Sequence, residues 1–423
     1  MTKVPTGRLQ RLASLARVGA RAGASMLVSQ DGDAAANQAA EVLGSLRGLA
    51  AKIGQMASYI DGLVPDAHHD TFEQALRGLR DSAPASPPEK VHALVEAELG
   101  APLSKLFTEW EPAPFASASI GQVHRARLHD GREVAVKVQH PGVQEAIEAD
   151  LRNGKVLQRM VHAFVPPNFN AREVFEEISQ RFREELDYTL EAERQRQFAA
   201  FHAGYPGVHI PKVVPTRSGR RVLTSELVSG MSLEQAAQQP PEIRVRYAET
   251  LWHFAYKTTL VDGLFNADPH PGNYLFNEDG SVNFIDFGCV QLLTASTLRS
   301  SRAAHIAAVR RDEPAFRRAA VQVGQTRGGA YEDAFTGYLH RCLRPVFESP
   351  YRITRPFVSQ LVGGLYELKN EAFTRGSQIV PLPPSTALLN RLQFGFMSVV
   401  ARLDAEVDYA AVERRFFEDA NLM

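Results

Sequence analysis

The sequence predicts an α+β fold in two lobes, with a helical extension before it and helical insertions within it. Alternating, strand-like residues are confined to the segments 122–138, 208–228 and 274–285. The segments 34–100, 143–200 and 294–423 have helical composition and spacing. We therefore expect a basic N-terminal segment over 1–33, a helical extension over 34–105, a mixed lobe over 106–228 and a helical lobe over 229–423.

Composition excludes several classes of protein. The 423 residues are 44% hydrophobic and 22% charged, with a net charge of −1 and an isoelectric point near 6.9, so no overall charge favours nucleic acid binding. The two cysteines, Cys289 and Cys342, form no CxxC pair, which argues against structural zinc and favours a reducing compartment. No apolar run approaches the roughly 18 residues of a membrane span.

The first thirty residues are basic and contain no acidic side chain. Leu9, Leu12, Leu15 and Val18 recur at roughly helical spacing, which suits an amphipathic helix lying on anionic lipid. A solvated terminus and an organelle transit peptide fit the same residues. We therefore expect a cytoplasmic chain without a transmembrane segment, with peripheral attachment to the inner face of a membrane as one alternative.

The helical extension carries polar residues on one face. Lys52 and Gln55 lie three residues apart, beside an apolar stripe that includes Leu49 and Ile53. By spacing alone, a packed helix with a solvated polar face is the simpler reading.

A hairpin is predicted where the helical pattern ends. Residues 122–128 and 133–138 alternate around the Asp130-Gly131 turn, and a loop of small residues, 116–120, precedes them. Small side chains let backbone N–H groups approach a polyphosphate. The second strand ends in Val134-Ala135-Val136-Lys137, which matches the strand whose lysine holds nucleotide phosphates in kinases.

The next segments predict helices and two further strands. Asp187 and Glu191 lie at i, i+4 on one helix face, where like charges repel unless a cation such as Lys137 lies between them. Strands are expected over 208–214 and 221–228. In a kinase, the junction at Glu226 and Val228 would be the hinge whose backbone holds adenine.

The segment 266–288 carries the chemistry. Asp268 and Asn273 have the D-x-x-x-x-N spacing, a hairpin is expected over 274–285 with its turn at 277–281, and Asp286 begins a DFG triplet. Kinases use such an Asp beside the attacking group, and an Asn plus a second Asp to hold magnesium. Either piece alone is a weak signal, whereas both in order favour phosphoryl transfer.

In combination, these motifs resemble the UbiB/ADCK atypical kinases, also called AarF-like proteins. The resemblance runs from about Pro5 to beyond Gly288 and rests on KIGQ (52–55), ASASIGQVHRA (116–126), VAVKVQHPGV around Lys137, EELDYTLEA (184–192), NADPHPGN (266–273) and FIDFG (284–288). The family often has His where this chain has Asn266, and Asn266 is expected to cap the loop by hydrogen bonding. Arg194 stands where the family commonly has Asn.

This resemblance implies a two-lobed protein-kinase-like fold that binds ATP with magnesium. It implies that Lys137 contacts the phosphates and pairs with Glu191, that Asp268 orients the acceptor or water, and that the KxGQ and ExD residues restrict access to the nucleotide. The implied sites are catalytic Asp268, Lys137 and Glu191; nucleotide-binding Ala116, Ser117, Ala118, Ser119, Ile120, Lys137, Glu226 and Val228; magnesium-binding Asn273 and Asp286; and regulatory Lys52, Gly54, Gln55, Glu185 and Asp187.

The implied biological role is support of ubiquinone or related isoprenoid-quinone biosynthesis by an atypical kinase that acts as an ATPase. The implied partners are nucleotide, lipid-soluble quinone intermediates or a membrane surface, and quinone-biosynthesis proteins. A protein or small-molecule kinase and an ATP-binding pseudokinase scaffold are the alternatives.

Overall fold

The computed structural model describes residues 85–117, 120–152, 179–180, 182–374 and 384–423. The amphipathic segment 1–30, the KIGQ residues Lys52, Gly54 and Gln55, and the loop residues Ala118 and Ser119 lie outside the described residues. Contacts divide the chain into two units, and each unit is discontinuous in sequence. Unit 1 comprises Met1–Ala192 and Val213–Leu227, and unit 2 comprises Glu193–Lys212 and Val228–Met423.

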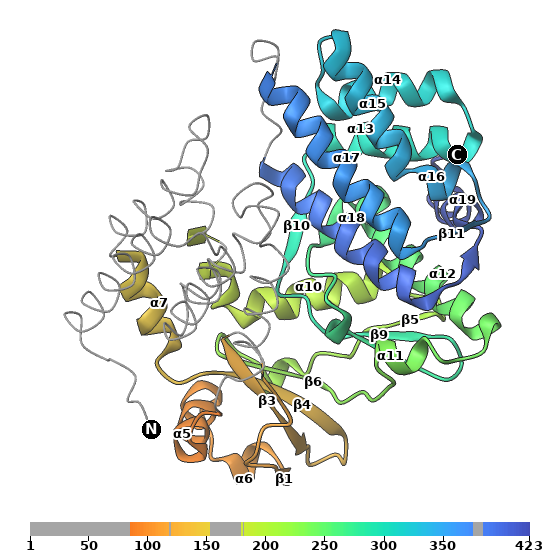
Figure 1. The fold of residues 1–423 in the computed structure, drawn as a ribbon. Coiled ribbons are helices and arrows are strands. Elements are labelled where there is room, and N and C mark those ends of the chain that lie inside the picture. Colours follow the sequence, from red (N-terminus) through yellow and green to blue (C-terminus); the bar gives the residue numbers. More distant parts are fainter. Residues whose placement is uncertain (1–84, 118–119, 153–178, 181, 375–383) are drawn as a thin grey trace, which may run out of the picture. The chain divides into compact units, whose positions relative to one another are not determined.

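A five-stranded antiparallel sheet forms the centre of the described part of unit 1, in the order β1-β3-β4-β6 with β2 beside β3 (Figure 1). Its strands are β1 (Glu109–Trp110), β2 (Ala116–Ser117), β3 (Gly121–Arg127), β4 (Glu133–Gln139) and β6 (Val222–Glu226). The predicted hairpin is confirmed as β3 and β4, and Gly131 in its turn has φ +87°. The register places Lys137 opposite Val123 of β3 and Leu223 of β6.

Short helices border this sheet. They are α5 (Pro88–Leu99), α6 (Leu103–Leu106), α7 (Val143–Arg152), the 3₁₀ turn η2 (Pro215–Arg217) and the first turn of α10 (Tyr188–Phe201). Val91 and Val95 of α5 are fully buried in one cluster with Val134, Val136 and Val138 of β4. This apolar contact explains why α5 covers that face of the strands.

A second, three-stranded sheet lies in unit 2. Strand β5 (Val208–His209) runs parallel to β9 (Val282–Phe284), and β9 is antiparallel to β8 (Tyr274–Phe276). The predicted hairpin around 277–281 is confirmed, with the Asn277 N–H donating to the Ser281 carbonyl at 3.0 Å. The strand predicted over 208–214 forms only at Val208–His209, so the prediction is wrong for 210–214. Pro211 has no N–H to continue the ladder, and Val213 makes a single isolated bridge, to Ser225.

Helices make up most of unit 2, and Figure 1 shows α13 to α17 lying against one another. The helices are α11 (Leu233–Ala236), α12 (Pro241–Lys257), the π turn η3 (Thr258–Asp262), the 3₁₀ turn η4 (Pro271–Asn273), α13 (Ala295–Arg310), α14 (Glu313–Gly324), α15 (Gly329–Cys342), α16 (Arg344–Phe347), α17 (Arg355–Thr374), α18 (Pro384–Leu403) and α19 (Tyr409–Asp419). Residues 242–262 are helical throughout, in α12 and η3.

Two short two-stranded sheets complete unit 2. They are β7 (Leu264–Asn266) with β10 (Val290–Leu292), and β11 (Tyr351–Arg352) with β12 (Glu406–Val407). Trp252 of α12 is fully buried in the core, and its indole N–H donates to the buried carboxylate of Glu413 on α19 at 3.0 Å. Throughout the described ranges, no helix combines the length and apolar character that crossing a membrane requires.

Candidate functional site

Lys137 and Glu191 form a bidentate ion pair in unit 1. The Lys137 Nζ lies 2.8 Å from Glu191 Oε1 and 2.9 Å from Oε2, and the two side chains are 17% and 6% exposed. Lys137 comes from the centre of β4 and Glu191 from the first turn of α10. Such a partly buried pair holds the ammonium group in one place, where it can meet an anionic ligand.

The small-residue loop begins as the short strand β2 and ends at Gly121, the first residue of β3. Ala116 pairs with Val123 of β3, Ile120 is 3% exposed, and the Ile120 carbonyl accepts from the His140 N–H at 2.8 Å. A Cβ on Gly121 would lie 2.5 Å from the Val138 carbonyl oxygen. Any other residue at 121 would therefore displace the backbone at the end of this loop.

The acidic ExD residues lie just before α10. Asp187 Oδ1 accepts from the Thr189 N–H at 3.0 Å, so Asp187 caps the helix, and its Oδ2 lies 3.8 Å from Arg220 Nε. Glu191, four residues on, is paired with Lys137 instead. The repulsion expected between Asp187 and Glu191 is thus relieved by a separate cation for each carboxylate.

The predicted catalytic loop is held by its own amide side chains in unit 2. Asn273 Nδ2 donates to the Asp268 carboxylate at 3.2 Å and to the Asp268 carbonyl at 3.1 Å. Asn266 caps the loop as expected, because its side-chain oxygen accepts from the Asp268 N–H at 3.1 Å. These bonds fix Asp268 and Asn273 relative to each other.

The DFG segment is attached to the same loop. Asn266 Nδ2 donates to the Asp286 carbonyl at 2.8 Å, and the Asp286 carboxylate accepts from the Gly288 N–H at 2.9 Å. Phe287 is fully buried, with its ring 5.2 Å from that of Phe198. Asp286 is therefore anchored on both sides, by a hydrogen bond to its carboxylate and by the packing of the next side chain.

The donor atoms of this loop suit magnesium. In the part of the chain that the structure describes, no group of three or more His, Cys, Asp or Glu side chains could hold a metal ion. Magnesium in nucleotide sites needs only one or two protein carboxylates, because phosphates and water complete its octahedron. Asn273 uses its amide nitrogen for Asp268, which leaves its carbonyl oxygen as the atom suited to a hard cation.

The expected hinge lies at the end of β6. Glu226 pairs with Val134 in the sheet, and the Leu227 N–H donates to the Glu133 carbonyl at 3.1 Å. Val228 begins the second segment of unit 2. Just beyond it, the Ser229 carbonyl accepts from Asn283 Nδ2 of β9 at 3.0 Å.

Two further contacts near these residues were not predicted from the sequence. Arg194 of α10 donates to the Gly288 carbonyl at 3.2 Å, within unit 2. In unit 1, the Ser86 N–H donates to Gln122 Oε1 at 2.7 Å, and Gln122 Nε2 lies 2.8 Å from the buried His124 Nε2. The sequence signal was the pair of polar residues at 122 and 124, which alternate onto the same face of the strand as Ala126.

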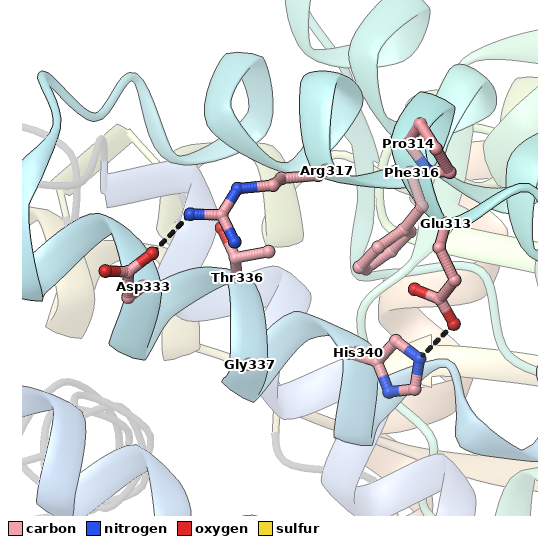
Figure 2. A pocket seen from close by; sticks show the side chains of 8 residues that line it. All are labelled: Glu313, Pro314, Phe316, Arg317, Asp333, Thr336, Gly337 and His340. Carbon is pink, nitrogen blue, oxygen red and sulfur yellow. Dashed lines mark hydrogen bonds and ion pairs between the residues drawn. The ribbon is translucent and has the colours of Figure 1, made fainter.

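A separate surface pocket of about 560 Å³ lies between α14 and α15 of unit 2 (Figure 2). It is lined by Glu313, Pro314, Phe316, Arg317, Asp333, Thr336, Gly337 and His340. Its polar side chains pair with one another: a Glu313 carboxylate oxygen lies 3.0 Å from His340 Nε2, and Arg317 forms an ion pair with Asp333. None of the predicted site residues lines this pocket.

Comparison with known proteins assigns the chain to a family. A family model described as the ABC1 atypical kinase-like domain matches residues 78–320, more than half of the chain. The chain belongs to this family. The resemblance to UbiB/ADCK atypical kinases and the α+β, protein-kinase-like fold are thereby confirmed.

Several named proteins are similar to this ABC1 family member. The chloroplastic protein Activity of BC1 complex kinase 7 of Arabidopsis thaliana is 36% identical over 242 residues, which cover 56% of this chain and 34% of the relative. The mitochondrial atypical kinase coq-8 of Caenorhabditis elegans is 32% identical over 263 residues, with coverage of 60% and 34%. The chain thus matches about a third of the length of each of these curated relatives.

A solved structure is similar over nearly its whole length. It is described as a complex of Rv3197 with erythromycin, from Mycobacterium tuberculosis, and is 30% identical to this ABC1 family member, with a TM-score of 0.62. The alignment covers 90% of this chain and 95% of that chain.

Proposed function

We propose that this chain binds Mg-ATP and acts as an ATP-dependent phosphotransferase that hydrolyses ATP more readily than it phosphorylates protein. Lys137, held by Glu191, would bind the phosphates together with the backbone of the loop Ala116, Ser117, Ala118, Ser119 and Ile120. The backbone at Glu226 and Val228 would receive adenine. These assignments rest on family membership and on the Lys137–Glu191 pair.

The remaining roles fall to the loop of unit 2. Asn273 and Asp286 would hold magnesium, which supplies positive charge against the phosphate oxygens. Asp268 would orient a water or acceptor hydroxyl and take up its proton. The oxygen of that group would then bond to the γ-phosphorus, while the bond between the γ-phosphorus and the β–γ bridging oxygen breaks and ADP is released. Positioning and charge stabilisation supply most of the rate enhancement in such reactions.

One observation carries the proposal. A continuous set of hydrogen bonds joins Asp268, Asn273 and Asn266 to the backbone of Asp286. These bonds hold the Asp268 carboxylate, the Asn273 amide and the backbone of Asp286 in fixed relative positions, which supports the proposal. Preorganisation of this kind is what phosphoryl transfer requires, because little covalent chemistry is left to the protein.

The test is Asp286→Asn, which removes one negative charge and keeps the side-chain shape. Wild type should be stabilised in a thermal shift assay by ATP with magnesium, and Asp286→Asn should lose that magnesium-dependent shift. Asp419→Asn, the same change at an exposed position of α19, serves as the control and should keep it. An unchanged shift in Asp286→Asn would remove Asp286 from the metal site, and a shift without any ATP turnover in wild type would favour the pseudokinase scaffold.

We further propose that this activity supports ubiquinone or related isoprenoid-quinone biosynthesis, in the cytoplasm or at the inner face of a membrane. Lys52, Gly54 and Gln55, with Glu185 and Asp187, would restrict which acceptors reach the nucleotide. The support for this role is family resemblance. Quinone levels in a deletion strain should fall and be restored by wild type but not by Asp286→Asn, and normal quinone levels after deletion would contradict the role.

A further inference from the structure

Tyr188 occupies a position beside Lys137 that no predicted role explains. It is the first residue of α10 and is 1% exposed, in a cluster that includes Ile120, Phe182 and Leu223. Its backbone N–H donates to the Arg220 carbonyl at 2.9 Å, which fixes the start of the helix against the segment before β6.

The Tyr188 ring contacts the ammonium group of the ion pair. Lys137 Nζ lies 5.1 Å from the centre of the ring, within the range of a cation–π interaction. Tyr188 and Glu191 are three residues apart and therefore share one face of α10. The first turn of this helix thus presents a ring face and a carboxylate to the same ammonium group.

The other end of Tyr188 reaches the end of the small-residue loop. A Cβ on Gly121 would lie 2.7 Å from Tyr188 Oη, so the phenol oxygen occupies the space that a side chain at 121 would fill. Residue 121 has to be glycine for the ring to sit there. One side chain therefore touches both the lysine and the loop to which phosphate binding is assigned.

We infer that Tyr188 is a positioning residue for the nucleotide phosphates, because it fixes the Lys137 ammonium group against Glu191 and the end of the loop at Gly121. The consequence for ATP rests on the proposed function, whereas the placement of Lys137 does not. Loss of the ring face should widen the range of positions that the Lys137 ammonium group adopts.

The experiment compares Tyr188→Leu with Phe182→Leu, the same truncation at a fully buried aromatic residue in the same cluster. The first readout is the Kd for Mg-ATP, which should weaken roughly three- to tenfold in Tyr188→Leu, as loss of a cation–π contact implies, and stay unchanged in Phe182→Leu. The second readout needs no nucleotide. It is the rate at which an amine-acylating reagent labels Lys137, measured by mass spectrometry with exposed Lys105 as internal reference, and it should rise only in Tyr188→Leu.

The outcomes distinguish the positioning role of Tyr188 from the proposed ATP-dependent function. If both Leu variants change Kd and labelling equally, Tyr188 is only a core residue and the inference is overturned. If Lys137 labelling rises in Tyr188→Leu but wild type binds no ATP, the positioning role stands and the proposed function fails. Tyr188→Phe keeps the ring face, so its Kd for Mg-ATP and its Lys137 labelling rate should lie within about twofold of the wild-type values. A Phe variant as defective as the Leu variant contradicts a role for the ring. Should Tyr188→Leu fail to fold, Tyr188→Met fills more of the space and is judged by the same criteria.

Discussion

Two buried histidines make unit 2 sensitive to acid. His202 and His253 are 4% and 7% exposed, with ring centres 5.4 Å apart, and no hydrogen-bond partner for either ring nitrogen of His202 is found in the described part of the chain. Burial, then repulsion from His253 and Lys257, lowers the pKa of His202 to about 2. Burial, then repulsion from Lys257 and Arg415, lowers the pKa of His253 to about 3.

The sign and size of the effect follow from linkage. A histidine whose folded pKa lies below its unfolded value of about 6.5 binds fewer protons when folded, so stability is lost as pH falls below that unfolded value. Between pH 7 and pH 5 the loss is about 2 kcal/mol for each such histidine, because the unfolded imidazole becomes protonated while the folded one stays neutral. This figure does not depend on the folded pKa as long as that pKa lies well below 5.

The assay uses the substitution His202→Phe. In the wild type, the His202 ring stacks on Phe254 with the ring centres 5.1 Å apart, and a Phe side chain can keep this stack. The substitution also removes the two ring nitrogens of His202, which lack a hydrogen-bond partner among the described residues. The variant should be at least as stable as wild type at pH 7, and its loss of unfolding free energy from pH 7 to pH 5 should be smaller by about 2 kcal/mol.

Unit 2 can be followed by itself in urea denaturation. The chain has two tryptophans, Trp110 in unit 1 and Trp252 in unit 2, so a Trp110→Phe background leaves Trp252 as the only tryptophan reporter. His129→Gln, at an exposed turn position of unit 1, is the control and should not alter the pH dependence seen by Trp252. A His202→Phe variant that loses as much stability as wild type on acidification would refute the idea that His202 is kept neutral by burial.

Two further substitutions test separate parts of the structure. Glu191→Gln removes the carboxylate that faces Lys137 at 2.8 Å, and titration calorimetry should show Mg-ATP binding weakened about tenfold; an unchanged Kd would mean that Lys137 does not need this partner. Gly337→Ala should raise the free energy of unfolding by about 0.5–1 kcal/mol, because Gly337 lies inside α15 and a Cβ there would meet no atom within 4 Å apart from its chain neighbours and the backbone of its own helix. A loss of stability in Gly337→Ala would indicate that the helix needs the glycine for a contact of another kind.

Local sequence signals predicted the local elements well. The turns at Asp130-Gly131 and at 277–281 lie between alternating residues, and both hairpins form where expected. The DxxxxN spacing identified Asp268 and Asn273, which the structure joins by hydrogen bonds. Each of these features is determined by residues within about ten positions of one another, so a reading of the sequence can find it.

Contacts between distant segments were predicted less well. Strands β11 and β12 are two residues long and pair Tyr351 with Val407, and neither segment has an alternating pattern of its own. The parallel pairing of Val208 with Val282 depends likewise on tertiary packing. Tyr188 was overlooked for the same reason, since its neighbours Gly121 and Lys137 come from strands more than fifty residues earlier.

The discontinuity of the two units has a consequence for how the protein is made. Residues 193–212 belong to unit 2, and their partners lie far later in the sequence. Strand β5 pairs with Val282, and Phe198 packs on Phe287. During synthesis these residues leave the ribosome before their partners exist, while unit 1 must wait until Leu227 to complete its sheet. A nascent chain that ends near residue 230 would thus carry every strand of the unit 1 sheet, together with Phe198 and β5, whose native partners at 282–287 are not yet synthesised.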